Sequence, residues 1–166
     1  MQVPRRRSEN IPQSPRDYHL SPEKYRALEE RLKRLKIKHP HEAAEVKRLA
    51  EMGDFSENAG YQLAKGRLRG LNRRIEELED LLKKAEIIMP DKDTSSIKAG
   101  HLVTVSSEGK EKTYRLLGAE ETDPAHGVIS LLSPLGAALL GKRVGETAVL
   151  EIGGRRKEYL ITKIST

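Results

Sequence analysis

Residues 61–85 read YQLAKGRLRGLNRRIEELEDLLKKA, and this stretch decides the fold. Its seam residues recur at alternating spacings of three and four: Tyr61, Ala64, Leu68, Leu71, Ile75, Leu78, Leu82 and Ala85. A heptad seam sustained without a gap is typical of a coiled-coil helix, which buries that seam against a partner helix. The stretch therefore predicts one half of a coiled coil, over about residues 57–87.

The partner helix is predicted directly upstream. Ser21 is a good N-cap, and Pro22 suits the first helical position. A second heptad seam follows at Leu28, Leu32, Leu35, His39, Glu42, Val46 and Leu49. Its phase continues across Pro40, which predicts one bent helix over about residues 22–52. The short turn at 53–57 then predicts an antiparallel hairpin about 45 Å long.

The pattern changes to a period of two after Gly100. Strands are predicted at 102–105, 112–117, 128–131, 147–152 and 156–164, with a short helix at 137–140. The fold class is therefore α+β, with a helical hairpin followed by a small antiparallel sheet. The expected division is a disordered basic arm at 1–20, the hairpin at 21–89, a linker at 90–99 and the sheet domain at 100–166.

The composition of the chain excludes several classes of function. The 166 residues contain no Cys, which excludes disulfides, thiol catalysis and Cys-based zinc sites. Aromatic residues make up 4%, which argues against a base-stacking platform. No apolar run is long enough for a membrane span and no secretory signal is visible, so we expect a cytoplasmic protein without a membrane partner. The net charge of +6 fits a polyanionic partner, and also simple solubility.

The turn between the helices is the strongest candidate site. Asp54 and Glu57 place two carboxylates three positions apart, and hard divalent cations such as Mg²⁺ prefer oxygen ligands. Two carboxylates are too few for a complete site, so a partner would have to supply the rest. On spacing alone, capping of the second helix is the favoured interpretation of the same residues, because acidic residues are routine near a helix N-terminus.

The segment from 61 to 74 is basic and contains no Asp or Glu. Its cationic residues are Lys65, Arg67, Arg69, Arg73 and Arg74, with Lys47 and Arg48 opposite them. Such side chains are suited to phosphate contacts. The alternative is a solvated helix face without a binding role. No P-loop, dinucleotide-binding motif or nucleophile elbow is present, and the His residues lack a zinc-site spacing.

Two further motifs stand out. The first is Gly53-Asp54-Phe55-Ser56-Glu57-Asn58-Ala59 followed by Tyr61. The second contains Ile129-Ser130, Ser133-Pro134-Leu135-Gly136, Ala138-Leu139-Leu140-Gly141-Lys142 and Gly145. The first resembles the tip motif of the Gre transcript cleavage factors, and the second is similar to the signature of their C-terminal domain. The resemblance covers about residues 21–166, and it implies a coiled-coil hairpin followed by an FKBP-like domain.

The resemblance also implies a mechanism and its partners. The C-terminal domain would dock at the secondary channel of bacterial RNA polymerase, and the coiled coil would enter it. Asp54 and Glu57 would then help to hold a second Mg²⁺ in trans, and the polymerase would cleave the nascent RNA 3′ end in backtracked, arrested complexes. The chain would not itself be an enzyme, and the free protein, expected to be a monomer, would hold no cofactor.

Further binding residues follow from the matched motifs. They are Ser56, Asn58, Tyr61, Ser133, Pro134 and Lys142, in addition to the basic segment. The chain departs from the family at Gly60, where an acidic residue is common. Two alternatives stay open: a Gre-like channel binder that inhibits or regulates polymerase without stimulating cleavage, and a coiled-coil interaction module unrelated to polymerase.

Overall fold

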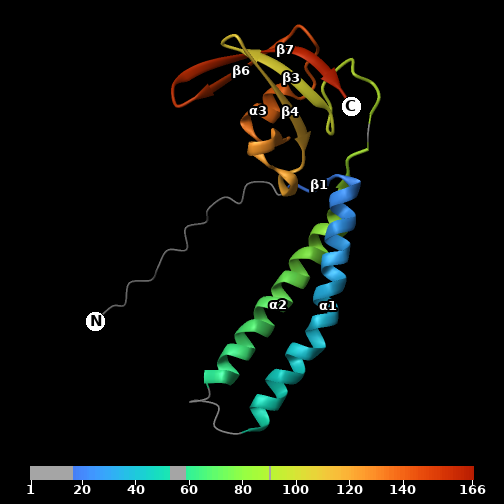
Figure 1. Cartoon of the computed structure of the whole chain (residues 1–166), viewed down its shortest axis with the longest axis vertical. Coiled ribbons are helices and arrows are strands. Elements are labelled where there is room, and N and C mark those ends of the chain that lie inside the picture. Colours follow the sequence, from blue (N-terminus) through green and yellow to red (C-terminus); the bar gives the residue numbers. More distant parts are fainter. Residues whose placement is uncertain (1–16, 53–58, 90) are drawn as a thin grey trace, which may run out of the picture.

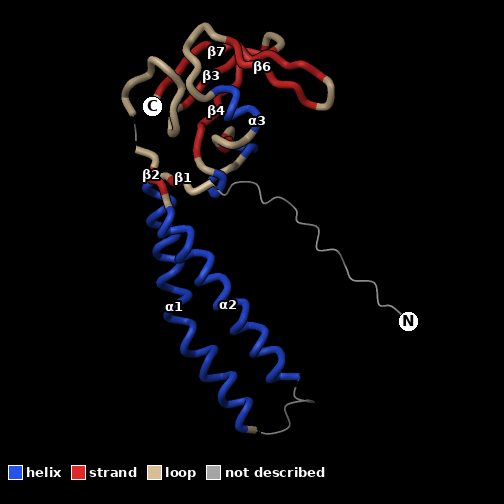
Figure 2. The backbone as a smooth tube through the Cα atoms, turned by 180° about the vertical axis from the view of Figure 1, so that it is seen from behind, coloured by secondary structure: helices blue, strands red, loops and turns tan. Residues whose placement is uncertain are grey.

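The computed structural model describes residues 17–52, 59–89 and 91–166. Figure 1 shows a long two-helix rod with a sheet domain at one end. The rod consists of α1 (Pro22–Glu51) and α2 (Ala59–Lys84), and Figure 2 shows the same two helices side by side from behind. The predicted helical hairpin is thus confirmed. Over the described residues, no helix has both the length and the apolar content needed to span a membrane.

The two heptad seams hold the rod together. Every seam residue between Leu28 and Leu49, and between Tyr61 and Ala85, is buried or half-buried. Ion pairs also join the helices: Lys36 Nζ lies 2.6 Å from Glu79 Oε1, and a longer pair joins Arg67 to Glu42 on the same rod. Such exposed pairs contribute about 1 kcal/mol at most, so apolar burial along the seams dominates the pairing of the helices.

The start of α1 matches its sequence signals. The Ser21 hydroxyl accepts a hydrogen bond from the Lys24 N–H at 3.1 Å, which is the expected N-cap geometry. Pro22 is the first helical residue, where the missing N–H costs no intrahelical bond. The helix also continues through Pro40 as a single element. The uninterrupted phase of the seam therefore predicted the continuity of α1 correctly.

The sheet domain contains a five-stranded sheet in the order β5-β4-β3-β7-β6. Its strands are β3 (Leu102–Ser107), β4 (Lys110–Leu117), β5 (Val128–Ser130), β6 (Thr147–Ile152) and β7 (Arg155–Ser165). β3 and β4 form one antiparallel hairpin and β6 and β7 form the other. Gly153 and Gly154 both have positive φ in the second hairpin turn, a conformation that favours glycine.

The predicted antiparallel pairing is present in β3–β4, β3–β7 and β6–β7, but the sheet as a whole is mixed. β5 pairs parallel to β4, with Leu116 opposite Ile129. Between them the chain crosses over through two 3₁₀ turns, η1 (Ala119–Glu121) and η2 (Pro124–His126). A period-two pattern reports which face of a strand is buried, but it carries no information about strand direction. The direction of β5 is set by this crossover.

The core of the sheet domain lies between the sheet and α3 (Pro134–Leu139). Its buried apolar residues are Ile97, Val103, Val105, Leu116, Ile129, Leu131, Leu139, Ala148, Ile161 and Ile164. Ile97 belongs to the segment expected as a linker, yet it is 1% exposed. Its N–H donates to the Lys142 carbonyl at 2.7 Å, and its carbonyl accepts from the Gly141 N–H at 2.8 Å. The second half of the expected linker is thus part of the core.

A small parallel pair joins the base of the rod to the sheet domain. β1 (His19–Leu20) pairs with β2 (Glu86–Ile87), which follows the end of α2. Leu20 is fully buried with Leu28 and Leu78 at the rod base. Residues 17–20 were predicted to belong to the disordered arm, but they are part of the folded base of the rod. Two-residue strands carry no readable periodicity, and this pair forms between segments far apart in the chain.

Asp17 is the most deeply placed charged group at this point, with a side chain that is 1% exposed. One carboxylate oxygen accepts from the His19 N–H at 3.0 Å and lies 2.8 Å from His19 Nδ1. The other accepts from the Ala119 N–H at 2.8 Å. Burial alone raises the pKa of Asp17, but the bonds from His19 and Ala119 outweigh it and keep that pKa below its usual value.

The rod should lose stability when its seam is truncated. Leu71 is 6% exposed and Leu63 is 62% exposed, although both lie on α2. We expect Leu71→Ala to lower the free energy of unfolding by about 2–5 kcal/mol because it leaves a cavity in the seam. The matched control Leu63→Ala should change it by about 0.5 kcal/mol or less. Urea unfolding followed by far-UV circular dichroism measures both, and equal losses would contradict the packing of the seams.

The stability contributed by Asp17 should depend on pH. A carboxyl whose pKa is lowered on folding stabilises the fold above its unfolded pKa of about 4, and this stabilisation is lost as the pH falls through the lower folded-state pKa. The stability difference between the unmodified chain and Asp17→Asn should thus be largest near about pH 6 and shrink below about pH 4. Urea titrations across this range test it, with the exposed Glu120→Gln as control; a difference independent of pH would contradict it.

Candidate functional site

The acidic tip motif falls between the two helices of the rod. Asp54, Ser56, Glu57 and Asn58 lie outside the described residues. The flanking helix ends, Glu51 in α1 and Ala59 in α2, are at the end of the rod away from the sheet domain (Figure 1). The metal-binding and capping interpretations of the two carboxylates therefore stay predictions. Gly60 is exposed in the first turn of α2.

The first described site residue beyond the tip is Tyr61. It is half-buried and belongs to the seam. The Lys65 ammonium lies 5.7 Å from the centroid of its ring, at cation–π distance. Tyr61 thus packs within the rod and also faces the first cation of the basic segment. Its predicted binding role comes in addition to this structural one.

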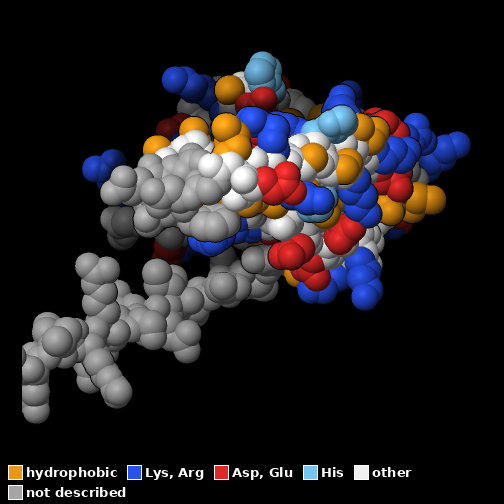
Figure 3. All heavy atoms as spheres, turned by 90° about the horizontal axis from the view of Figure 1, so that it is seen from below, with side chains coloured by type: hydrophobic (Ala, Val, Ile, Leu, Met, Phe, Trp, Pro, Cys, Tyr) orange, Lys and Arg blue, Asp and Glu red, His pale blue; other side chains and the backbone are white. Residues whose placement is uncertain are grey.

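The basic segment flanks the seam on both sides. On a helical repeat of 3.6 residues, Lys65, Arg69 and Arg73 share one stripe, while Arg67 and Arg74 share another. All five side chains belong to exposed residues. Figure 3, the view along the rod from its far end, shows basic and acidic side chains interleaved on the visible surface. The segment is therefore a set of separate cations around the rod.

Two of these cations are already paired. Arg73 Nε donates to Glu77 Oε1 at 2.8 Å, and this hydrogen bond raises the pKa of the Arg73 guanidinium above its usual value. Arg67 Nε lies 3.4 Å from Glu42 Oε2. For Arg69 and Arg74, the described part of the chain contains no ion-pair partner. These two are the cations most available to an outside anion, a distinction that the sequence did not make.

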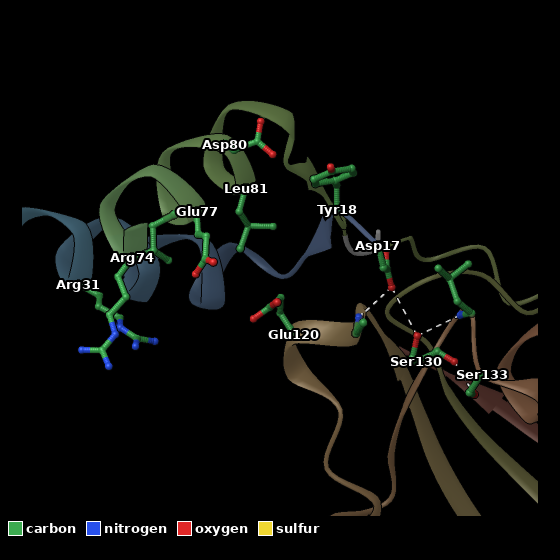
Figure 4. A pocket seen from close by; sticks show the side chains of 13 residues that line it. Asp17, Tyr18, Arg31, Arg74, Glu77, Asp80, Leu81, Glu120, Ser130 and Ser133 are labelled. Carbon is green, nitrogen blue, oxygen red and sulfur yellow. Dashed lines mark hydrogen bonds between the residues drawn. The ribbon is translucent and has the colours of Figure 1, made fainter. Parts of the chain in front are cut away.

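Arg74 also faces a cavity of about 830 Å³ at the base of the rod. Figure 4 shows Arg31 of α1 and Arg74 of α2 together on its rod side, with Glu120 on the opposite side. The remaining lining residues are Asp17, Tyr18, Glu77, Leu78, Asp80, Leu81, Ala119, Ser130, Leu132 and Ser133. The cavity thus separates the rod from the sheet domain, and both charge signs line it. Arg31 was not among the predicted site residues.

The predicted residues of the sheet domain shape the start of α3. The Ser133 hydroxyl accepts from the Gly136 N–H at 3.0 Å and donates to the Ser130 carbonyl at 2.6 Å. Pro134 is the first residue of the helix and is exposed. A Cβ on Gly136 would lie 2.0 Å from the Ser130 carbonyl oxygen, so only glycine fits there. The Ser-Pro-Leu-Gly motif therefore shapes the start of α3, in addition to its predicted binding role.

Exposed apolar residues flank α3 on both sides in the sequence. Leu132 is 52% exposed, Leu140 is 47% exposed and Val144 is 54% exposed. Lys142, the last predicted binding residue, lies between Leu140 and Val144 in the sequence and is half-buried. Its backbone carbonyl accepts the hydrogen bond from the Ile97 N–H. These apolar residues were not among the predicted site residues, because an apolar side chain is more often part of the core.

Among the described residues, no three His, Asp or Glu side chains are grouped as a metal site requires. Several acidic residues of the rod instead pair with Lys or Arg, as Asp80 does with Lys84 at 2.7 Å. Asp54 and Glu57 are thus the carboxylates for which a metal role is predicted. They provide only oxygen ligands, which is the donor set that fits a hard divalent cation.

Comparison with known proteins covers both parts of the chain. Residues 18–87 match the family model described as "Transcription elongation factor, N-terminal", and residues 92–166 match "Transcription elongation factor, GreA/GreB, C-term". The transcription elongation factor GreA of Maricaulis maris is 40% identical over 143 residues, covering 84% of this chain and 91% of that protein. The GreA of Desulfovibrio desulfuricans is 40% identical over 151 residues, covering 88% and 92%.

Among solved structures, the chain is similar to GreA factor homolog 1 of Thermus thermophilus, with 25% identity and a TM-score of 0.43. The alignment covers 91% of this chain and 100% of that one. The two family matches lie on the rod and on the sheet domain in the order in which the structure places them, and the relatives from Maricaulis and Desulfovibrio span both parts. The chain belongs to the GreA/GreB family of transcription elongation factors.

Proposed function

We propose that this chain binds bacterial RNA polymerase through its secondary channel and stimulates endonucleolytic cleavage of nascent RNA in backtracked, arrested complexes. Membership of the GreA/GreB family over both the rod and the sheet domain carries this proposal. The factors of this family stimulate cleavage by polymerase and are not themselves enzymes. The rod supports the proposal physically, because α1 contains 30 residues and so extends about 45 Å from the sheet domain.

The residues proposed to act at the polymerase centre are Asp54 and Glu57. Both belong to the tip motif, which lies in the chain between α1 and α2. A second Mg²⁺ in the polymerase complex would supply Lewis-acid stabilisation of the phosphodiester transition state and lower the pKa of an attacking water. The carboxylates of Asp54 and Glu57 would provide oxygen ligands and orient that water, with polymerase supplying the remaining ligands.

The basic segment is proposed to contact the phosphates of the RNA 3′ end. Lys65, Arg69 and Arg74 support this role, since they are exposed and are not held by an ion pair among the described residues. Phosphate contacts of this kind position a nucleic acid without reading its sequence. The proposed docking residues in the sheet domain are Ser133, Pro134 and Lys142, which lie in and beside α3. We propose no cofactor for the free protein.

The tip can be tested without disturbing the helix cap. Asp54→Asn removes the charge but keeps a residue that caps a helix equally well, so capping alone predicts no loss of activity. We expect Asp54→Asn and Glu57→Gln each to lower the maximal rate of RNA cleavage by at least about tenfold, as loss of a metal-orienting group does. The measurement is cleavage in stalled, backtracked polymerase complexes with Mg²⁺.

The matched control is Glu51→Gln, which removes an exposed carboxylate from the last turn of α1. It should leave the rate unchanged. Binding to polymerase should persist in all three variants. If the unmodified chain binds but cleavage stays at background, the protein is a channel binder that regulates polymerase without stimulating cleavage, and Gly60→Asp then tests whether the missing acidic residue is the reason. Absence of binding would contradict the proposal.

The basic segment gives a second test. We expect Arg69→Ala to raise the factor concentration needed for half-maximal cleavage more than Arg73→Ala does, because Glu77 already neutralises part of the Arg73 charge. Loss of one phosphate contact should also reduce the slope of log affinity against log salt by about 0.7–0.9. Titrations at several salt concentrations measure both effects, with Lys33→Ala on α1 as control. Equal effects of the Arg69 and Arg73 variants would contradict the assignment.

A further inference from the structure

From the contacts between residues 17–21 and the sheet domain, we infer that Asp17 and Glu121 are positioning residues for RNA cleavage. They hold the rod at one angle to the sheet domain and thereby decide where the acidic tip lies. The functional part of this inference rests on the proposed function. Neither residue belongs to the tip, the basic segment or the start of α3, so neither would touch the reacting atoms.

The rod acts as a long lever. With an extension of about 45 Å, a rotation of about 10° at its base displaces the far end by about 8 Å. Groups that take part in catalysis must lie within about 1 Å of their working positions. The angle between the rod and the sheet domain therefore matters for function. Contacts at the base of the rod control this angle far more strongly than contacts along its length.

Two carboxylates connect the segment before α1 to η1. Asp17 Oδ2 accepts from the Ala119 N–H at 2.8 Å and from the Ser130 hydroxyl at 3.4 Å (Figure 4). Glu121 accepts from the Ser21 N–H at 2.7 Å through one oxygen, and from the Ser21 hydroxyl through the other. The partners are separated by 100 or more positions in the chain. Ionised acceptors give the stronger class of hydrogen bond, and Asp17 is buried.

Between these two contacts, backbone packing sets how closely β1 approaches the start of η1. A Cβ on Gly118 would lie 1.7 Å from the His19 carbonyl oxygen, so β1 rests directly against the backbone at the start of η1. On its other side, β1 is bound to β2 at the end of the rod, where the Glu86 N–H donates to the Tyr18 carbonyl at 2.8 Å. Residues 17–21 are thus clamped between the rod base and the sheet domain.

Apart from these contacts and the buried Ile88 side chain beside Gly100, a cavity lies between the rod and the sheet domain. The cavity of about 830 Å³ lies between α2 and the segment from η1 to α3, with Arg74 and Glu77 on one side and Glu120 and Leu132 on the other. A narrow contact beside an open cavity resists rotation only through its specific bonds, since relative motion is the default for parts without a large apolar interface. The orientation therefore depends on the bonds of Asp17 and Glu121.

The first test measures orientation directly. The chain contains no Cys, so spin labels attach only at introduced sites. Arg34→Cys on α1 and Glu111→Cys on β4 place two labels at exposed positions on the rod and on the sheet domain. We expect one narrow distance distribution in pulsed electron resonance for the otherwise unmodified chain. Asp17→Ala combined with Glu121→Gln should broaden or shift it, and Gly118→Ala should do the same by steric displacement of β1.

The matched control is Glu120→Gln, because Glu120 is the exposed neighbour of Glu121 and makes no hydrogen bond within the described ranges. It should leave the distribution unchanged. Thermal unfolding identifies any variant that fails to fold, and the single change Glu121→Gln remains informative because it removes only one carboxylate acceptor. A distribution that stays narrow and unshifted in the folded variants overturns the inference, whatever the cleavage assay shows.

The second test uses cleavage. We expect Asp17→Ala with Glu121→Gln to lower the maximal rate by about tenfold or more, with a change of less than about twofold in the concentration for half-maximal effect, because the docking and tip residues remain in place. A purely structural role would instead reduce the amount of folded factor and leave the rate per folded molecule unchanged. If the unmodified chain stimulates no cleavage, the proposed function fails, while the label distances still decide whether Asp17 and Glu121 hold the rod at one angle to the sheet domain.

Discussion

Burial of one heptad seam against the other is the constraint on which the structure depends. Neither helix of the rod has another apolar surface to pack against over most of its length, so the seam residues from Leu28 to Leu49 and from Tyr61 to Ala85 cover each other. This packing explains how a chain with only 36% hydrophobic residues supports an extended fold. It also leaves the outer faces of the rod free for charge, including the basic segment.

The rod and the sheet domain have separate apolar cores, one around Leu20, Leu28 and Leu78 and one around the five-stranded sheet. Their connection combines the apolar side chain of Ile88, buried beside Gly100, with polar contacts. A buried carboxylate, Asp17, and the Ser21–Glu121 pair join them beside a large cavity. Such an arrangement combines a stiff rod with an orientation set by a few hydrogen bonds, which suits a factor whose proposed active groups lie far from its proposed docking surface.

The candidate site was partly predictable from sequence. The absence of acidic residues from 61 to 74 marked the basic segment, whereas the two carboxylates predicted at Asp54 and Glu57 lie outside the described residues and stay a prediction. The structure then separated its cations, because Arg67 and Arg73 meet Glu42 and Glu77 while Arg69 and Arg74 meet no such partner among the described residues. Glu42 lies on the other helix, so that pairing depends on how the helices align.

Local patterns in the chain predicted the helical hairpin, the continuity of α1 through Pro40, the N-cap at Ser21 and both β-hairpins, because periodicity and capping are local properties. The parallel pairing of β5, the place of Ile97 in the core, and the contacts of Asp17 and Glu121 depend on the folded arrangement of the whole chain. These features join residues far apart in the chain. A repeat pattern records which side of an element is buried, whereas the partner it meets depends on the path of the whole chain.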